Sequence, residues 1–314
     1  MALALLFPGQ GSQAVGMGAD LAAAFASARA VFEEVDEALG QSLFKLMRDG
    51  PIEDLTLTEN AQPALMAVSL AVTRTLEAEF GVPVRSAAFV AGHSLGEYSA
   101  LAAAGAISLS DTARLLKLRG LAMQRAVPVG QGAMASLIGP KSDVALAETA
   151  AAAGAEIGVC VVANDNNTGN VVISGDKAAV ERAIAKAKEL GAKAILLNVS
   201  APFHCPLMRP AADEMARALE ETTVTPPQAP LVANVTARPV LDPEQIRALL
   251  VEQVTGRVRW RESIEWLAGD GGVTRFAEAG AGKALTGMVK RIAPDAPCAA
   301  LNGPADLEAF AATL

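Results

Sequence analysis

The apolar residues of this 314-residue chain fall into many short runs that Gly, Pro and charged positions interrupt. Two of these runs, residues 3–7 and 87–91, each lead into a glycine-rich turn, which is the pattern of a buried strand. Apolar residues recur at helical spacing over 58–80 and 110–126. Ser110 and Asp111 have the residue types expected at a helix N-cap. The pattern predicts strands and helices packed in α/β layers.

A different pattern follows over residues 132–199. Its expected strands are 133–138, 157–163, 170–174 and 194–198, and its expected helices are 142–153 and 177–190. The order β-α-β-β-α-β is the ferredoxin-like arrangement. Beyond it we expect helices at 208–221, 243–254 and 261–268, and strands near Leu231 and Val273. The sequence therefore predicts a large, doubly wound α/β domain formed by 1–128 and 199–314, interrupted by a smaller domain at 129–198.

Composition narrows the class of protein. Although 52% of the residues are apolar, no run approaches the roughly 20 residues that span a bilayer. The apolar start, residues 1–7, has no basic residue before it and meets Pro8 and Gly9 at once, so no signal peptide is expected. A net charge of -8 argues against general nucleic-acid binding. The three cysteines have no paired spacing, which predicts free thiols. We expect a cytoplasmic enzyme without metal.

The strongest chemical pattern is Gly-His-Ser-Leu-Gly at residues 92–96. It fits G-x-S-x-G, in which small residues flank a serine held on a strained turn between a strand and a helix. Gly and Ser also crowd ordinary loops, so the five residues alone leave a purely structural turn open. The expected strand before them and helix after them favour Ser94 as a nucleophile.

A serine nucleophile needs a base, and the chain has two histidines. His93 adjoins Ser94 on a tight turn, where neighbouring side chains diverge. His204 remains, in a loop at 200–206 that two prolines restrict. Nothing singles out an Asp or Glu to orient it, so we expect a dyad in which a carbonyl group holds the second ring nitrogen.

Acyl transfer also needs hydrogen-bond donors for an oxyanion. The N–H of Leu95 is one candidate, and the glycine-rich turn at 7–13 offers another. That turn lacks the Lys of a P-loop and does not match G-x-G-x-x-G, which disfavours nucleotide hydrolysis. Arg119 lies on an expected helix that also carries several leucines, which favours burial, and a buried arginine needs a carboxylate partner. The alternative is an exposed side chain, because a single arginine on a helix is more often exposed.

Four segments together, 7–13, 92–98, Arg119-Gly120 and 202–204, resemble the malonyl-CoA:acyl carrier protein transacylase family over nearly the whole chain. The resemblance implies a hydrolase-like core with a ferredoxin-like insertion. It also implies a ping-pong reaction through a malonyl-serine, with Ser94 as nucleophile and His204 as base. By the same resemblance the N–H groups of Gln10 and Leu95 form the oxyanion hole. The resemblance also implies that Arg119 binds the malonyl carboxylate.

Further site residues are carried over from the family motifs. A glutamine carbonyl steadies the histidine in this family, and Gln253 matches that position. Phe203 resembles the malonyl-selecting form of its motif, in which a bulky ring excludes an extra methyl group. Asn164 matches a position that faces coenzyme A. Asn170 departs from an expected glutamine, and Asn234 belongs to a segment predicted to be structural.

The resemblance also implies partners. These are malonyl-CoA and holo acyl carrier protein, with no cofactor, nucleic acid or membrane involved. Because the carrier is acidic and this chain is itself negative, we expect docking on a local basic surface at Lys283, Lys290 and Arg291. A monomer is expected.

Three alternative functions stay open: a serine thioesterase, a non-catalytic scaffold, and a polyketide-pathway acyltransferase that takes another acyl group. We expect the enzyme to supply fatty-acid synthesis, and the sequence leaves polyketide synthesis open.

Overall fold

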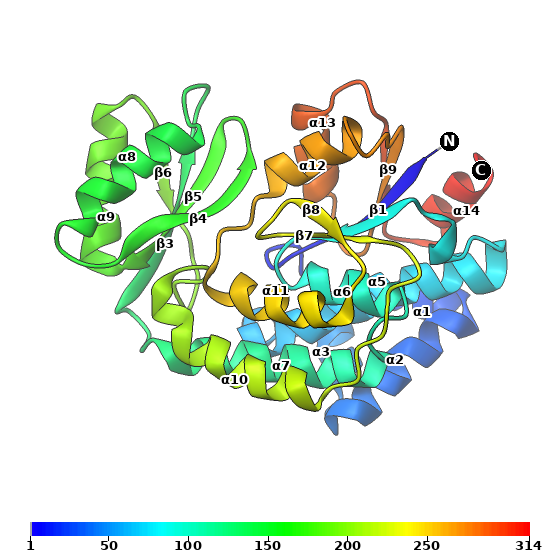
Figure 1. Ribbon diagram of the computed structural model, residues 1–314. Coiled ribbons are helices and arrows are strands. Elements are labelled where there is room, and N and C mark those ends of the chain that lie inside the picture. Colours follow the sequence, from blue (N-terminus) through cyan, green and yellow to red (C-terminus); the bar gives the residue numbers. More distant parts are fainter. Residues whose placement is uncertain (1) are drawn as a thin grey trace.

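The structure is a computed structural model that describes residues 2–314. Within these residues the strands form two sheets (Figure 1). The larger sheet has the order β10-β9-β1-β2-β7-β8 and is parallel except where β8 pairs with β7. Its strands are β1 (Leu3–Phe7), β2 (Phe89–Gly92), β7 (Leu231–Ala233), β8 (Arg238–Val240), β9 (Arg275–Ala279) and β10 (Cys298–Leu301).

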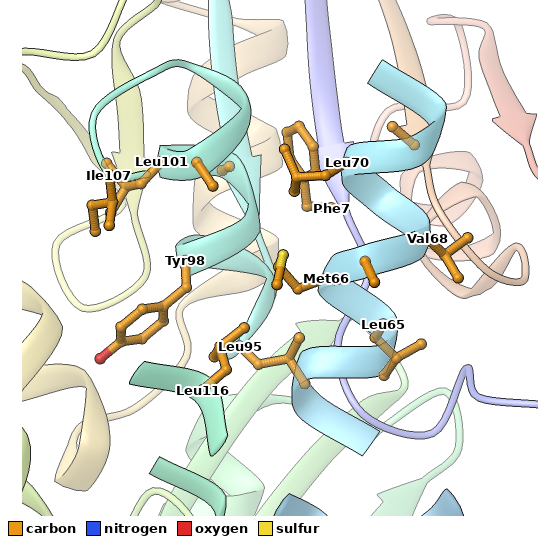
Figure 2. Close-up of a cluster of buried hydrophobic side chains, with 14 of the residues drawn as sticks. Phe7, Leu65, Met66, Val68, Leu70, Leu95, Tyr98, Leu101, Ile107 and Leu116 are labelled. Carbon is orange, nitrogen blue, oxygen red and sulfur yellow. The ribbon is translucent and has the colours of Figure 1, made fainter. Parts of the chain in front are cut away.

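Alternation along β1 places apolar side chains on both faces of the larger sheet, as a parallel sheet between two helical layers requires. Leu5 and Phe7 join the main core, and Leu6 joins a second apolar cluster on the opposite face. Figure 2 shows the main core where side chains from β1, α5, α6 and α7 meet. The helices on that side include α5 (Thr58–Phe80), α6 (Gly96–Ala103) and α7 (Leu109–Ala126); the other side carries α12 (Trp260–Ala268) and α13 (Ala284–Ile292).

Further helices complete the larger domain. They are α1 (Ala19–Ala24), α2 (Ala26–Leu39), α3 (Leu43–Asp49), α4 (Ile52–Thr56), α10 (Arg209–Glu221), α11 (Pro243–Thr255) and α14 (Pro304–Ala311), with short 3₁₀ turns η1 (Val84–Ser86) and η2 (Pro206–Met208). Across residues 2–314, no helix combines the length and the apolar character needed to cross a bilayer.

The smaller sheet is antiparallel, with the order β4-β5-β3-β6, and lies at one side of the molecule (Figure 1). It contains β3 (Gly132–Ile138), β4 (Cys160–Asn167), β5 (Asn170–Asp176) and β6 (Lys193–Leu196), covered by α8 (Val144–Ala155) and α9 (Lys177–Glu189). The ferredoxin-like prediction is confirmed. Leu137 and Ile173 pack in the local core with these helices, whereas Met134 and Val172 join the main core. The exact boundaries at 129 and 198 stay a prediction.

Several predicted element ends were wrong. Helix α7 begins at Leu109, because Ser108 and not Ser110 is the N-cap: its Oγ accepts the Asp111 N–H at 3.0 Å. Strand β4 begins at Cys160, three residues later than predicted, because 157–159 lead out of α8 as a turn. Strand β6 ends at Leu196, where its pairing with β3 stops. The segment from there to His204 is a loop beside the site.

Candidate active site

Ser94 sits on a sharp turn between β2 and α6 with a backbone φ of 53°. Such a left-handed conformation is strained for a residue with a side chain and persists only when its surroundings enforce it. Two glycines let the turn pack tightly. A Cβ on Gly92 would lie 1.9 Å from the Gly96 carbonyl carbon, and one on Gly96 would lie 2.2 Å from the Phe7 carbonyl oxygen. The predicted strand-turn-helix geometry of this motif is therefore present.

Asn234 holds the same turn from the end of β7. Its Oδ1 accepts the Ser94 N–H at 2.8 Å, and its Nδ2 donates to the Gly92 carbonyl at 2.6 Å. The Gly92 carbonyl is buried and the Ser94 N–H is partly buried, and main-chain polar groups withdrawn from water in this way need partners. The Asn234 side chain thus stabilises the strained turn, and this is the kind of structural role that the sequence predicted for it.

His204 faces the serine hydroxyl, with 2.8 Å between His204 Nε2 and Ser94 Oγ. Its Nδ1 lies 2.9 Å from the main-chain oxygen of Gln253 and 3.2 Å from that of Gly256, at the end of α11. Carbonyl oxygens only accept, so Nδ1 carries the proton and Nε2 presents a lone pair to Ser94. The arrangement is a dyad oriented by carbonyl groups.

Burial lowers the pKa of His204 to about 3, and the positive charge of Arg119 acts in the same direction. The imidazole is therefore neutral at physiological pH, as a general base must be before it takes a proton.

His93 does not share this role. Its Nε2 lies 2.8 Å from Asn166 Oδ1, and its ring packs 5.5 Å from that of Trp260. The prediction that neighbouring side chains diverge on this turn agrees with that arrangement.

Arg119 is buried, with 1% of its surface exposed, and points at Ser94. Its Nη2 lies 3.2 Å from Ser94 Oγ and 2.8 Å from Gln253 Oε1, and its Nη1 lies 2.8 Å from Gln62 Oε1. The alternative of an exposed helix arginine was wrong, because Gly120 lets α7 approach the start of α5: a Cβ there would lie 2.5 Å from the Glu59 Cα. A buried guanidinium whose hydrogen-bond partners are two amides and a hydroxyl, all neutral, is suited to receive a carboxylate.

Gln253 lies beside His204, and its main chain and its side chain contact different groups. The main-chain carbonyl bonds His204, whereas the side-chain amide turns toward Arg119 and donates from Nε2 to the Ser94 carbonyl at 2.9 Å and to Glu97 Oε2 at 2.7 Å. Sequence reasoning missed Gln62 and Glu97. Glu97 directly follows the G-x-S-x-G motif, and the available signal was that it is the only charged residue of its helix. Nothing in the sequence marks Gln62.

A cavity of about 360 Å³ opens in front of these residues. Its walls include Gln10, Leu95, Asn164 and Phe203, so the structure brings these predicted site residues together with Ser94. Leu95 is the N-cap of α6, where N–H groups lack partners within the helix. The turn that carries Gln10 comes close to this point, because a Cβ on Gly9 would lie 2.8 Å from the His93 carbonyl oxygen.

The predicted basic residues line a second hollow of the surface, whereas Ser94 and His204 line the first cavity. Lys283, Lys290 and Arg291 are exposed at α13 and line this hollow together with Asn167 and Asn170 from the β4–β5 hairpin. Helix α13 also borders the main cavity through Leu285 and Met288. Within residues 2–314, no group of three or more His, Cys, Asp and Glu side chains is arranged to hold a metal ion.

Comparison with known proteins adds independent findings. The acyl transferase domain family matches residues 4–294. The malonyl CoA-acyl carrier protein transacylase of Escherichia coli K12 is 45% identical over 98% of this chain and 97% of its own length, and that of Bacillus subtilis 168 is 42% identical over 99% and 97%.

Solved structures of similar proteins also include malonyltransferases. The acyl-carrier-protein-S-malonyltransferase of Bartonella henselae has a TM-score of 0.96 and 53% identity, with 100% of this chain and 99% of the other covered. A malonyl-transacylase in complex with its type II PKS acyl carrier protein has a TM-score of 0.95 and 43% identity, with both chains fully covered at 100%.

Proposed function

We propose that this chain moves a malonyl group from coenzyme A to the phosphopantetheine thiol of an acyl carrier protein. The chain belongs to the acyl transferase family and, within it, to the malonyl-CoA:acyl carrier protein transacylases. One observation carries the proposal. Ser94 Oγ has a neutral histidine at 2.8 Å and a buried guanidinium at 3.2 Å. A nucleophile, its base and a carboxylate-binding group thus meet at one atom.

In the first half-reaction Ser94 Oγ attacks the thioester carbonyl of malonyl-CoA while His204 Nε2 takes the hydroxyl proton. The N–H groups of Leu95 and Gln10 receive the oxyanion of the tetrahedral intermediate. Its collapse breaks the carbon–sulfur bond, and the departing coenzyme A sulfur takes the proton from His204. The product is a malonyl ester of Ser94, with His204 neutral again.

The second half-reaction runs through the same groups in reverse. His204 removes the proton of the carrier thiol, whose sulfur attacks the malonyl ester. The carbon–oxygen bond to Ser94 then breaks, and Ser94 Oγ recovers the proton from His204. Each half-reaction is balanced without an added reagent, so the proposed reaction requires no cofactor.

Selectivity follows from the walls of the cavity. Arg119 pairs with the free carboxylate of a malonyl group, which an acetyl group lacks, and a buried arginine left unpaired is unfavourable. Phe203, in the loop beside His204, restricts the space for an extra methyl group. Asn164, 6% exposed on the wall of the cavity, contacts the coenzyme A arm.

The acyl carrier protein docks beside α13, where Lys283, Lys290 and Arg291 form the basic surface. A local patch of this kind lets a chain of net charge -8 bind an acidic partner. The protein acts in the cytoplasm as a monomer and supplies fatty-acid synthesis. A polyketide pathway is the second candidate, because the relative solved with its carrier binds a type II PKS acyl carrier protein.

The rival reading as a thioesterase predicts release of the acyl group to water. We would measure malonyl-holo-carrier formation and free malonate in the same reaction. We expect transfer to exceed hydrolysis by at least about a hundredfold at saturating carrier, because a transferase must exclude water from its acyl-enzyme. The matched control is Ser94→Ala, which should make neither product. Malonate as the main product would contradict the proposal.

A further inference from the structure

Glu97 is a buried carboxylate that the proposed reaction does not use. It lies in the first turn of α6, three residues after the nucleophile, and only 1% of its surface is exposed. Its Oε2 accepts from Gln253 Nε2 at 2.7 Å and from the Asn234 N–H at 3.3 Å. Its Oε1 has no partner among residues 2–314. Burial of a carboxylate is costly, so its presence at this point calls for a role.

The partners of the Gln253 side chain determine which way its amide points. Arg119 offers only N–H donors, so the atom at 2.8 Å from its Nη2 must be the amide oxygen. The other end of the amide faces the Ser94 carbonyl and the Glu97 carboxylate, which accept from it. Only one orientation of the amide satisfies all three neighbours.

This orientation decides what Arg119 can do. The amide oxygens of Gln253 and Gln62 hold the two ends of the guanidinium, and Nη2 stays 3.2 Å from Ser94 Oγ. Because both amides are neutral, they hold the positive charge of Arg119 toward Ser94 and leave it without a carboxylate partner. A carboxylate in direct contact with Arg119 would compete with the carboxylate of the substrate. Glu97 instead contacts the Gln253 amide, which in turn contacts Arg119.

We propose that Glu97 is a positioning residue for the selection of carboxylate-bearing acyl groups. As an acceptor it fixes, together with the Ser94 carbonyl, the orientation of the Gln253 amide, whose oxygen then holds Arg119 toward the acyl site. The inference rests on the proposed function, since it concerns how Arg119 discriminates malonyl from acetyl groups. The role depends on an acceptor oxygen at the Oε2 position, which a glutamine side chain also provides.

The test compares Glu97→Gln, which keeps an acceptor oxygen, with Glu97→Leu, which removes it. The readout is the ratio of acylation rates with malonyl-CoA and acetyl-CoA, followed by intact mass. Arg119→Ala sets the ratio for complete loss of carboxylate recognition. Leu101→Ala is the control for loosened packing, because Leu101 is buried on the same helix but belongs to the apolar core.

We expect Glu97→Leu to lower the malonyl-to-acetyl ratio by about tenfold or more, because a buried donor of Gln253 loses its partner. Glu97→Gln should stay within about threefold of wild type, and Leu101→Ala should lower the melting temperature without changing the ratio. Glu97→Met replaces the leucine variant if that one does not fold.

A parallel fall of both rates in Glu97→Leu, with the ratio unchanged, would overturn the proposal and leave Glu97 a packing residue. An equal loss in Glu97→Gln would also overturn it. Failure of the proposed function is distinguishable, since wild type would then form no malonyl adduct at all.

Discussion

At the scale of single residues, the environment of His204 sets the protonation state on which the chemistry depends. Its ordinary pKa of 6.5 falls to about 3 because burial disfavours the imidazolium and Arg119 repels it. A base with a lowered pKa stays neutral until the pH falls through that lower value. Acylation should therefore persist well below the pH at which a free histidine would be half protonated.

We expect kcat/KM for malonyl-CoA to change by less than about threefold between pH 8 and about pH 5. The measurement is initial acylation rate across that range. Burial also raises the pKa of Glu97 to about 7, so the profile is recorded on Glu97→Gln as well, where that titration is absent. A loss of activity centred near 6.5 in both proteins would show that His204 titrates as an ordinary histidine, contrary to this account.

Sequence alone could propose Ser94 and His204 as a pair, because the signals for both residues are local, and the structure places their side chains 2.8 Å apart. Ser94 lies in a five-residue motif, and His204 is the remaining histidine once His93 is set aside. The supporting polar residues could not be predicted in the same way. Gln62, Glu97 and Gln253 come from three different helices, and their roles depend on which atoms meet after folding. The family motif points to Gln253, yet sequence does not distinguish its main-chain oxygen, which lies 2.9 Å from His204 Nδ1, from its side chain, which contacts Arg119 and Glu97.

At the scale of elements, close contact between α5 and α7 brings Arg119 to the site. Gly120 permits that contact, because any larger residue would meet the main chain at Glu59. We expect Gly120→Ala to destabilise the protein by about 1–3 kcal/mol through overpacking, measured by chemical denaturation. Malonyl acylation should weaken with it, since α7 carries Arg119.

The matched control is Gly287→Ala in α13, where an added Cβ meets nothing within 4 Å. That change should be neutral or stabilising by up to about 1 kcal/mol, because alanine favours a helix over glycine. Equal effects of the two substitutions would show that helix propensity, and not the α5–α7 contact, controls the result.

Long, strongly patterned elements were predicted best. Helix α5 has the predicted bounds, and the predicted bounds of α7 differ only at its start, whose N-cap is Ser108. The predicted set contained none of the helices between Ala19 and Thr56, although α2 buries Ala28, Phe32 and Val35 at helical spacing. Val31, Phe32, Val35 and Leu39 also recur at that spacing, so the pattern was available in the sequence and the prediction missed it.

At the scale of the whole molecule, charge must be distributed so that an acidic carrier can approach an acidic enzyme. We expect Lys283→Glu and Lys290→Glu each to raise KM for holo carrier protein by about fivefold or more, while acylation by malonyl-CoA stays within about twofold. The measurement is steady-state transfer at varied carrier concentration.

Lys188→Glu is the control, since this exposed lysine lies on α9, at the outer side of the smaller sheet (Figure 1). It makes the same charge change at a distance from α13. An unchanged KM in the α13 variants, or an equal rise in the control, would contradict the proposed docking surface.

We propose that Ser94 carries the malonyl group between the two thiols. The decisive measurement is intact mass after brief incubation with malonyl-CoA, acetyl-CoA or methylmalonyl-CoA, on wild type and on Ser94→Ala. We expect one malonyl adduct on wild type, none on Ser94→Ala, little adduct from the other two thioesters, and loss of the adduct when holo carrier protein is added. An adduct that persists in Ser94→Ala, or the absence of an adduct on wild type, would show that Ser94 does not carry the malonyl group.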